Sequence, residues 1–157
     1  MDEERLASDR GSAVAGSDFR PEFLSPDEAS RFQLYCTVDE FAAGAMLMED
    51  GSPGDFLAFV LAGKLAVRKA TAFPGRYILV AEIEAGGLVG ECAGVVKGER
   101  AATVVAVEPS RLLVLTHEQL QEMMAREPDL AFRLLQWIIL VQGRRLRKAS
   151  ERLSWIL

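Results

Sequence analysis

The chain has 157 residues, half of them hydrophobic, and a formal net charge of −5. This length is typical of one domain with a substantial core, and this composition excludes a chain that is disordered throughout. The acidic balance argues against a domain that binds nucleic acid over its whole surface, because such domains are usually basic.

The first segment, residues 1–20, is small and polar without periodicity, and we expect a flexible tail there. Its acidic start is unlike a secretory signal. The two cysteines, Cys36 and Cys92, have no CxxC spacing, which favours free thiols in a reducing compartment. The longest apolar run, Trp137–Val141, is too short to cross a bilayer. We therefore predict a cytoplasmic protein without membrane contact, with one domain over residues 21–157.

Two helices are predicted from their cap residues. Ser25 is expected to be an N-cap, with Pro26 at the first helical position and Glu28 completing a capping box. Far along the chain, Thr116 is expected to cap a helix that ends near Arg126. These two helices bracket the part of the chain that has a β pattern.

Between Leu34 and Thr116 the chain consists of short apolar runs interrupted by Gly, Pro and Asp. Ala62-Gly63 separates two of these runs and is a hairpin signal. Several short strands at this spacing predict an antiparallel sandwich or roll. The predicted strands cover residues 56–61, 64–68, 77–81, 103–107 and 112–115.

A long helix is predicted over residues 130–153, with Pro128 ending the preceding helix and Asp129 capping the new one. Its apolar surface exceeds what one small roll can cover, so we expect two copies to pair through it as a homodimer. The basic cluster Gly143–Lys148 is interpreted as a solvated helix face. The apolar residues near one stripe are Leu130, Leu134, Ile138, Val141 and Leu153, and the surface expected to pair is Leu134, Trp137, Ile138 and Val141.

The most informative stretch runs from Gly90 to Val104. It sets one carboxylate, Glu91, and one guanidinium, Arg100, on either side of a segment rich in small residues, with strand-like sequence at both ends. A carboxylate accepts the proton of a sugar hydroxyl, and a guanidinium donates to two phosphate oxygens at once. Small residues let backbone N–H groups approach an anion, and a helix start adds a favourable dipole. This combination suits a small ligand that carries both a sugar and a phosphate.

The same stretch resembles the phosphate-binding cassette of cyclic-nucleotide-binding domains, in the version found in regulatory subunits of cyclic-AMP-dependent protein kinase. In that version a Gly-Glu pair is followed by Arg-Ala-Ala-Thr-Val, and the separation of nine residues between Glu91 and Arg100 is the same. At family level the resemblance covers roughly residues 22–153. The matching residues are Gly90, Glu91, Ala93, Arg100, Ala101, Ala102, Thr103 and Val104, preceded by the glycines Gly44, Gly51, Gly54 and Gly63.

The resemblance implies a mainly β fold: an antiparallel β-roll of the jelly-roll, double-stranded β-helix type with flanking helices and a long C-terminal helix. It implies reversible binding of a cyclic nucleotide without chemistry on it, and a signal carried by that last helix. In the family's pattern Glu91 accepts the ribose 2′-hydroxyl and Arg100 pairs with the cyclic phosphate. Members that prefer cyclic GMP often have Ser or Thr just after the arginine, so Ala101 resembles binders of cyclic AMP. The implied ligand-binding residues are Gly90, Glu91, Cys92, Ala93, Arg100, Ala101 and Ala102, with backbone N–H groups around Cys92 and Ala93 adding hydrogen bonds.

Two other classes of function stay open. An enzyme of the same roll class needs a metal site with two or more histidines, whereas His117 is the only histidine and is expected to face solvent. We therefore predict no metal, no cofactor and no catalytic residue. An interaction or dimerisation module that has lost nucleotide binding would keep the fold, but the complete cassette argues against it.

The long last helix also resembles the dimerising helix of bacterial catabolite-activator-type regulators. Those regulators continue into a helix-turn-helix DNA-binding domain, and we predict no such domain in residues 1–157. The chain is then either a stand-alone sensor or a regulatory domain of a longer protein.

Overall fold

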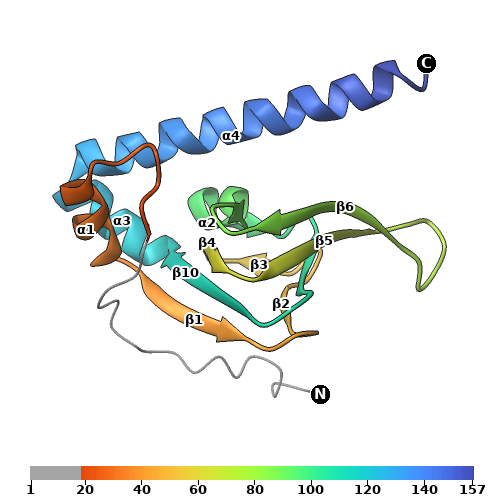
Figure 1. The fold of residues 1–157 in the computed structure, drawn as a ribbon, viewed down its shortest axis with the longest axis horizontal. Coiled ribbons are helices and arrows are strands. Elements are labelled where there is room, and N and C mark those ends of the chain that lie inside the picture. Colours follow the sequence, from red (N-terminus) through yellow and green to blue (C-terminus); the bar gives the residue numbers. More distant parts are fainter. Residues whose placement is uncertain (1–18) are drawn as a thin grey trace.

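The structure, a computed structural model that describes residues 19–157, contains two facing four-stranded sheets with helices gathered on one side (Figure 1). The strands are β1 (Thr37–Phe41), β2 (Met46–Met48), β3 (Pro53–Gly54), β4 (Phe56–Ala62), β5 (Lys64–Ala70), β6 (Tyr77–Glu84), β7 (Leu88–Val89), β8 (Gly98–Glu99), β9 (Thr103–Ala106) and β10 (Ser110–Thr116). The first sheet has the order β1-β10-β4-β7 and the second β2-β9-β5-β6, and β3 pairs with β8. Every pair is antiparallel, which confirms the predicted β-roll.

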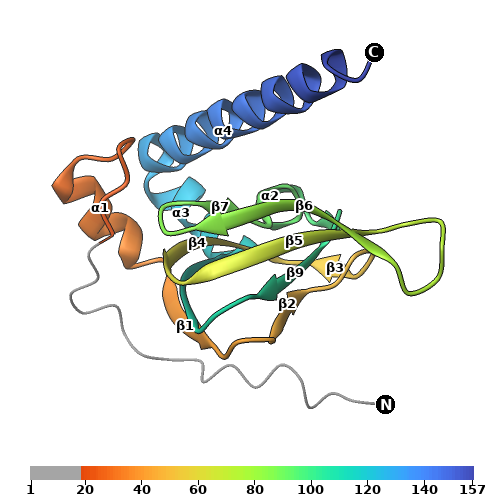
Figure 2. The same ribbon diagram turned by 45° about the vertical axis from the view of Figure 1, so that its right-hand side comes forward.

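Residues 19–157 contain four helices, and the longest crosses above the short helix of the cassette (Figures 1 and 2). They are α1 (Pro26–Gln33), α2 (Glu91–Val96), α3 (His117–Arg126) and α4 (Pro128–Ser154). The predicted caps of α1 and α3 are confirmed: Ser25 forms a capping box with Glu28, and the Thr116 hydroxyl accepts from the Gln119 N–H. No helix among residues 19–157 combines the length and the apolar character needed to cross a membrane.

The start of α4 differs from the prediction. Pro128 occupies the first turn and Glu127 is the N-cap, so Asp129 is not the cap. Proline is favoured at the first helical position because its missing N–H needs no partner there. Asp129 instead places its carboxylate in the first turn, where the helix dipole favours a negative charge.

The predicted hairpin across Gly63 is wrong, because β4 and β5 lie in different sheets. Gly63 has a φ of +95°, and a Cβ there would lie 2.2 Å from the Ser110 hydroxyl oxygen. The chain therefore turns sharply against β10 at this glycine as it crosses from the first sheet to the second. The hairpin of this region joins β5 to β6 instead, with Ala70 opposite Tyr77.

The strands β4 and β10 divide the core into two layers. Leu57 and Phe59 of β4 face the helices, whereas the intervening Ala58 and Val60 face the second sheet. The same alternation holds along β10, as the period of two in a strand requires. The first sheet is therefore buried on both faces, which holds the helices at a fixed place relative to the second sheet.

The N-terminal boundary of the fold lies earlier than predicted. Residues 1–18 of the predicted tail lie outside the described residues, but Phe19 is buried in the helical layer of the core. Its ring lies 5.7 Å from that of Phe32 and 5.1 Å from that of Phe59, between centroids. Aromatic contacts of this kind bury a large apolar area, so Phe19 belongs to the domain.

The apolar stripe of α4 is only partly as predicted. Leu130, Leu134 and Ile138 are buried against the roll, whereas Leu153 is exposed because α4 continues past the helical layer of the core. The expectation that Leu134, Ile138 and Trp137 are left for a second copy is wrong, since they pack within their own chain.

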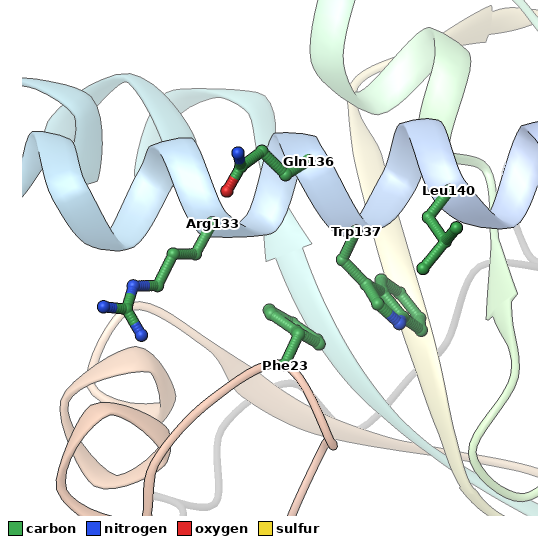
Figure 3. Close-up of a pocket in the computed structure, with 5 residues that line it drawn as sticks. All are labelled: Phe23, Arg133, Gln136, Trp137 and Leu140. Carbon is green, nitrogen blue, oxygen red and sulfur yellow. The ribbon is translucent and has the colours of Figure 1, made fainter.

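Trp137 illustrates this packing, with its ring stacked 4.8 Å from Phe23 and 5.5 Å from Phe59. Figure 3 shows this region, an open hollow of about 410 Å³ beside α4. The hollow is lined by Phe23, Arg133, Gln136, Trp137 and Leu140. It contains no residue of the cassette.

A stability measurement separates the two sides of α4. Leu134→Ala should lower the free energy of unfolding by about 2–5 kcal/mol, because Leu134 is fully buried and its truncation leaves a cavity. Arg144→Ala, exposed on the same helix, should change it by no more than about 0.5 kcal/mol. Urea unfolding of both variants checks this, and equal losses would contradict the packing of α4 described here.

Candidate ligand-binding site

A cavity of about 500 Å³ lies between the second sheet, α2 and the distal half of α4. We call it the cassette cavity. Its walls include Val80 of β6 and Met48 of β2, and α4 contributes Arg145, Lys148 and Arg152. The structure brings together around this cavity all seven residues singled out from the sequence: Gly90, Glu91, Cys92, Ala93, Arg100, Ala101 and Ala102.

The glycines of the cassette allow its parts to approach closely. Gly90 has a φ of +71°, and a Cβ there would lie 2.6 Å from Arg100 Nη1. At Gly94 a Cβ would lie 2.7 Å from the backbone nitrogen of Leu57, so glycine lets α2 lie directly against β4. Gly54 is equally restricted, since its Cβ would lie 2.7 Å from Arg100 Nε. Two of these three glycines therefore make room for the arginine itself.

Arg100 is a buried cation. Its Nη1 donates to the carbonyl oxygens of Phe56 (2.8 Å) and Gly90 (3.1 Å), and its guanidinium lies 4.5 Å from the centre of the Phe56 ring. Among residues 19–157, no carboxylate lies within ion-pair distance of it. Burial lowers the pKa of the Arg100 guanidinium, while Asp55 and Glu91 oppose that shift. Arginine nevertheless stays protonated in proteins, so the cavity wall carries a positive charge that an anion can satisfy.

Glu91 is also buried, and its partners come from α4. Arg145 Nη1 donates to Glu91 Oε1 at 2.6 Å, and Gln142 Nε2 donates to the same oxygen. Arg145 Nη2 donates to the Leu88 carbonyl oxygen at 2.6 Å. Arg145 thus joins the helix to the start of the cassette through a two-armed contact of the kind guanidinium groups favour.

These α4 contacts were not predicted from the sequence. The interpretation of Gly143–Lys148 as a solvated face is wrong for Arg145, although Arg144, Arg147 and Lys148 are exposed. No sequence signal identifies Gln142. The basic cluster was the one available indication, because a cationic run beside a buried carboxylate invites an ion pair.

Cys92 and His117 have structural surroundings rather than reactive ones. Cys92 is exposed, but partial desolvation and the nearby Glu91 raise the pKa of its thiol against the lowering effect of Arg145, so the sulfur stays protonated at neutral pH. His117 does not simply face solvent as predicted, because its Nδ1 lies 3.0 Å from the Gly94 carbonyl oxygen and ties α3 to α2. In the described part of the chain, no group of three His, Cys, Asp or Glu residues is arranged to hold a metal ion.

Comparison with known proteins places this geometry in a family. The sequence profile of the cyclic nucleotide-binding domain matches residues 38–127, more than half of the chain. A cyclic AMP receptor protein of Thermus thermophilus is 31% identical over 131 residues, or 83% of this chain. The solved structure of a cyclic nucleotide-binding domain from Methylobacillus flagellatus has a TM-score of 0.77 and 26% identity over 82% of this chain and 72% of that one. The chain therefore belongs to the cyclic nucleotide-binding domain family, with a β-roll fold and a regulatory role.

The relatives are longer than the match. A candidate potassium channel protein of Rhodopseudomonas palustris is 34% identical over 121 residues, which are 77% of this chain but 28% of that protein. The match to the Thermus thermophilus protein covers 58% of its length. This chain therefore spans only part of the length of these two relatives.

The Arg145 contact leads to a prediction for the chain without ligand. Arg145→Met should raise amide hydrogen exchange over residues 142–153, because this distal half of α4 has few buried apolar contacts to hold it. Loss of the charged contacts should cost about 1–2 kcal/mol, or about a 5- to 30-fold increase in exchange rate.

Arg147→Met is the matched control, since Arg147 is exposed on the same helix and does not line the cassette cavity. Exchange measured by mass spectrometry should leave residues 130–141 unchanged in both variants. If the two variants exchange alike over residues 142–153, Arg145 does not hold the helix.

Proposed function

We propose that this protein is a cyclic AMP sensor that binds the nucleotide reversibly in the cassette cavity and performs no chemistry on it. The observation that carries the proposal is that Arg100 is buried with no carboxylate partner among residues 19–157, in the same cavity as a buried glutamate. A cyclic phosphate would satisfy the guanidinium, and the ribose 2′-hydroxyl would donate to Glu91. Backbone N–H groups around Cys92 and Ala93 would add hydrogen bonds to the ligand.

The choice of base rests on Ala101. This residue lines the cavity directly after Arg100 and offers no hydroxyl to the amino group of guanine. The name of the Thermus thermophilus relative, a cyclic AMP receptor protein, agrees with adenine as the base. We further propose a cytoplasmic location, in keeping with two free cysteines and no candidate membrane span in the described residues.

The signal would leave through α4. Gln142 and Arg145 of α4 both donate to Oε1 of Glu91. Oε2 is therefore left as the acceptor for the sugar hydroxyl. A ligand bound there would hold Glu91 in place and with it the contacts of Gln142 and Arg145. The ligand would then bind more tightly when α4 is docked than when it is undocked. This difference in affinity between the two states is what a signal requires.

Substitution of the arginine tests ligand binding directly. Arg100→Leu should leave the fold intact and weaken cyclic AMP binding by about 2–5 kcal/mol, about 30-fold to several thousand-fold, because the bound phosphate loses its desolvated partner. Calorimetric titration measures the change.

Arg111→Leu provides the matched control, since Arg111 is exposed on β10 and pairs with Glu40 far from the cavity. It should bind as the parent does. A folded Arg100→Leu variant with parental affinity would refute the cassette assignment, and a parent that binds no cyclic nucleotide would favour the alternative of an interaction module that no longer binds one.

A second substitution tests the nucleotide preference. The parent should bind cyclic AMP more tightly than cyclic GMP. Ala101→Thr should reduce the difference between the two binding free energies by about 0.5–1.5 kcal/mol, the contribution of one added hydrogen bond. Ala101→Val has the shape of threonine without the hydroxyl and should leave the ratio of the two dissociation constants unchanged. A parent that prefers cyclic GMP, or a valine variant that shifts the ratio as much as threonine, would contradict the role of Ala101.

We also propose that two copies pair through α4, using a surface other than the one predicted from sequence. Four exposed apolar residues follow one another at intervals of seven: Phe132, Ile139, Leu146 and Leu153. A repeat of seven keeps residues on the seam between two supercoiled helices. Gly143, on the same side, has open space around its Cβ position, which allows a partner helix to approach closely.

Light scattering over a concentration series tests the pairing. The parent should be dimeric, and Leu146→Glu should be monomeric, because it would place two carboxylates at the centre of the apolar seam. Leu34→Glu is the control, since Leu34 is also exposed but lies at the end of α1. A parent that remains monomeric at the highest concentration, or a Leu34→Glu variant that dissociates like Leu146→Glu, would remove the proposal.

A further inference from the structure

Lys69, on β5, reaches the turn that follows Arg100. Its Nζ donates to the Ala101 carbonyl oxygen at 2.7 Å and lies 3.0 Å from a carboxylate oxygen of Asp50. Lys69 and Asp50 both lie outside the sequence motif of the cassette. The ammonium group therefore links three separate segments: β5, the loop that follows β2, and the turn between Arg100 and β9.

The same turn is held by its neighbouring backbone. The Gly51 N–H donates to the Arg100 carbonyl oxygen at 2.8 Å, and the Arg100 N–H donates to the Ser52 carbonyl oxygen at 2.7 Å. The Asp50 N–H donates to the Thr103 hydroxyl at 3.1 Å. The carbonyl groups of Arg100 and Ala101 are thus both committed to partners outside the cavity wall.

The direction of these carbonyl groups fixes the direction of the N–H groups that follow them. A trans peptide is planar, and its C=O and N–H point in opposite directions. The described residues contain no cis peptide bond. The N–H groups of Ala101 and Ala102 therefore point away from Gly51 and Lys69, and both alanines line the cassette cavity.

We infer that Lys69 is a positioning residue of the anion site: by holding the Ala101 carbonyl, it aims the Ala102 N–H at the ligand's phosphate beside Arg100. The inference rests on the proposed function. Asp50 supports this contact, because its carboxylate pairs with the Lys69 ammonium group and keeps it beside the turn. The turn would otherwise be free to rotate the Ala101–Ala102 peptide and lose one donor to the anion.

The chain offers a close control on the same strand. Lys64 begins β5 and pairs with Glu84 of β6 at 3.4 Å, as Lys69 pairs with Asp50, but its ammonium group makes no contact with the turn after Arg100. Replacing either lysine by methionine removes one positive charge from β5. A difference between the two variants therefore reports the contact with Ala101 rather than the general charge of the strand.

The experiment compares Lys69→Met, Lys69→Arg and Lys64→Met in the full chain with cyclic AMP. Lys69→Met should bind about 3- to 10-fold more weakly than the parent, the effect of one hydrogen bond. Lys69→Arg, which keeps a cationic donor, should recover most of the loss, and Lys64→Met should match the parent. Melting temperatures without ligand should agree among all four proteins. The backbone amide resonance of Ala102 should shift on ligand binding in the parent and shift less in Lys69→Met.

The outcomes separate this inference from the proposed function. A parent that binds and a Lys69→Met variant with equal affinity would refute the inference alone. Equal losses of affinity in Lys69→Met and Lys64→Met would also refute it, because the loss would then come from long-range charge. An Ala102 shift in Lys69→Met that equals that of the parent would refute it too, because Lys69 would then not position this N–H group. A parent that binds neither cyclic AMP nor cyclic GMP would refute the proposed function and this inference with it.

Discussion

The buried guanidinium of Arg100 is the constraint on which the architecture of the site depends. A charge removed from water is unfavourable unless it is hydrogen-bonded, and two backbone carbonyl groups and the face of Phe56 provide that environment here. These partners come from β4 and from the turn before α2, so the arginine fixes two segments far apart in the sequence. Gly54 and Gly90 are required for the same reason, since any side chain at either would occupy the place of the arginine.

The features that could be predicted from the sequence are those whose residues lie close together along the chain. The caps at Ser25 and Thr116 involve partners three residues away, and the cassette is one continuous stretch, so a pattern in the chain reports them directly. The partners of Glu91 lie 51 and 54 residues away, at Gln142 and Arg145, where no local pattern records the contact. The predicted hairpin at Gly63 was wrong for a related reason. A glycine between two apolar runs gives the same sequence pattern whether the two strands pair or lie in different sheets.

The two sides of α4 show why composition alone misassigned its apolar residues. Leu134 and Ile138, four apart, face the roll, while Ile139 and Leu146, seven apart, face outward. Both spacings were present in the sequence, but the helical layer of the core decides which one is buried. Phe19 belongs to that layer together with Phe32 and Phe59, although it lies in a segment whose composition indicated a tail. Tertiary packing therefore overrode a correct local interpretation of amphipathicity.

In the proposed function, Glu91 lies between the ligand and α4, and this position would let the domain transmit a signal without moving its sheets. The two sheets share a close-packed core through β4 and β10, so they cannot adjust continuously. The distal half of α4 has little such packing, and its link to the cavity wall passes through Glu91 and the Leu88 carbonyl. Linkage is reciprocal: if docking of α4 improves the site for a sugar, then the sugar must stabilise the docked helix by the same free energy. In this proposal α4 would respond because it is the element whose docking equilibrium the Glu91 carboxylate can shift.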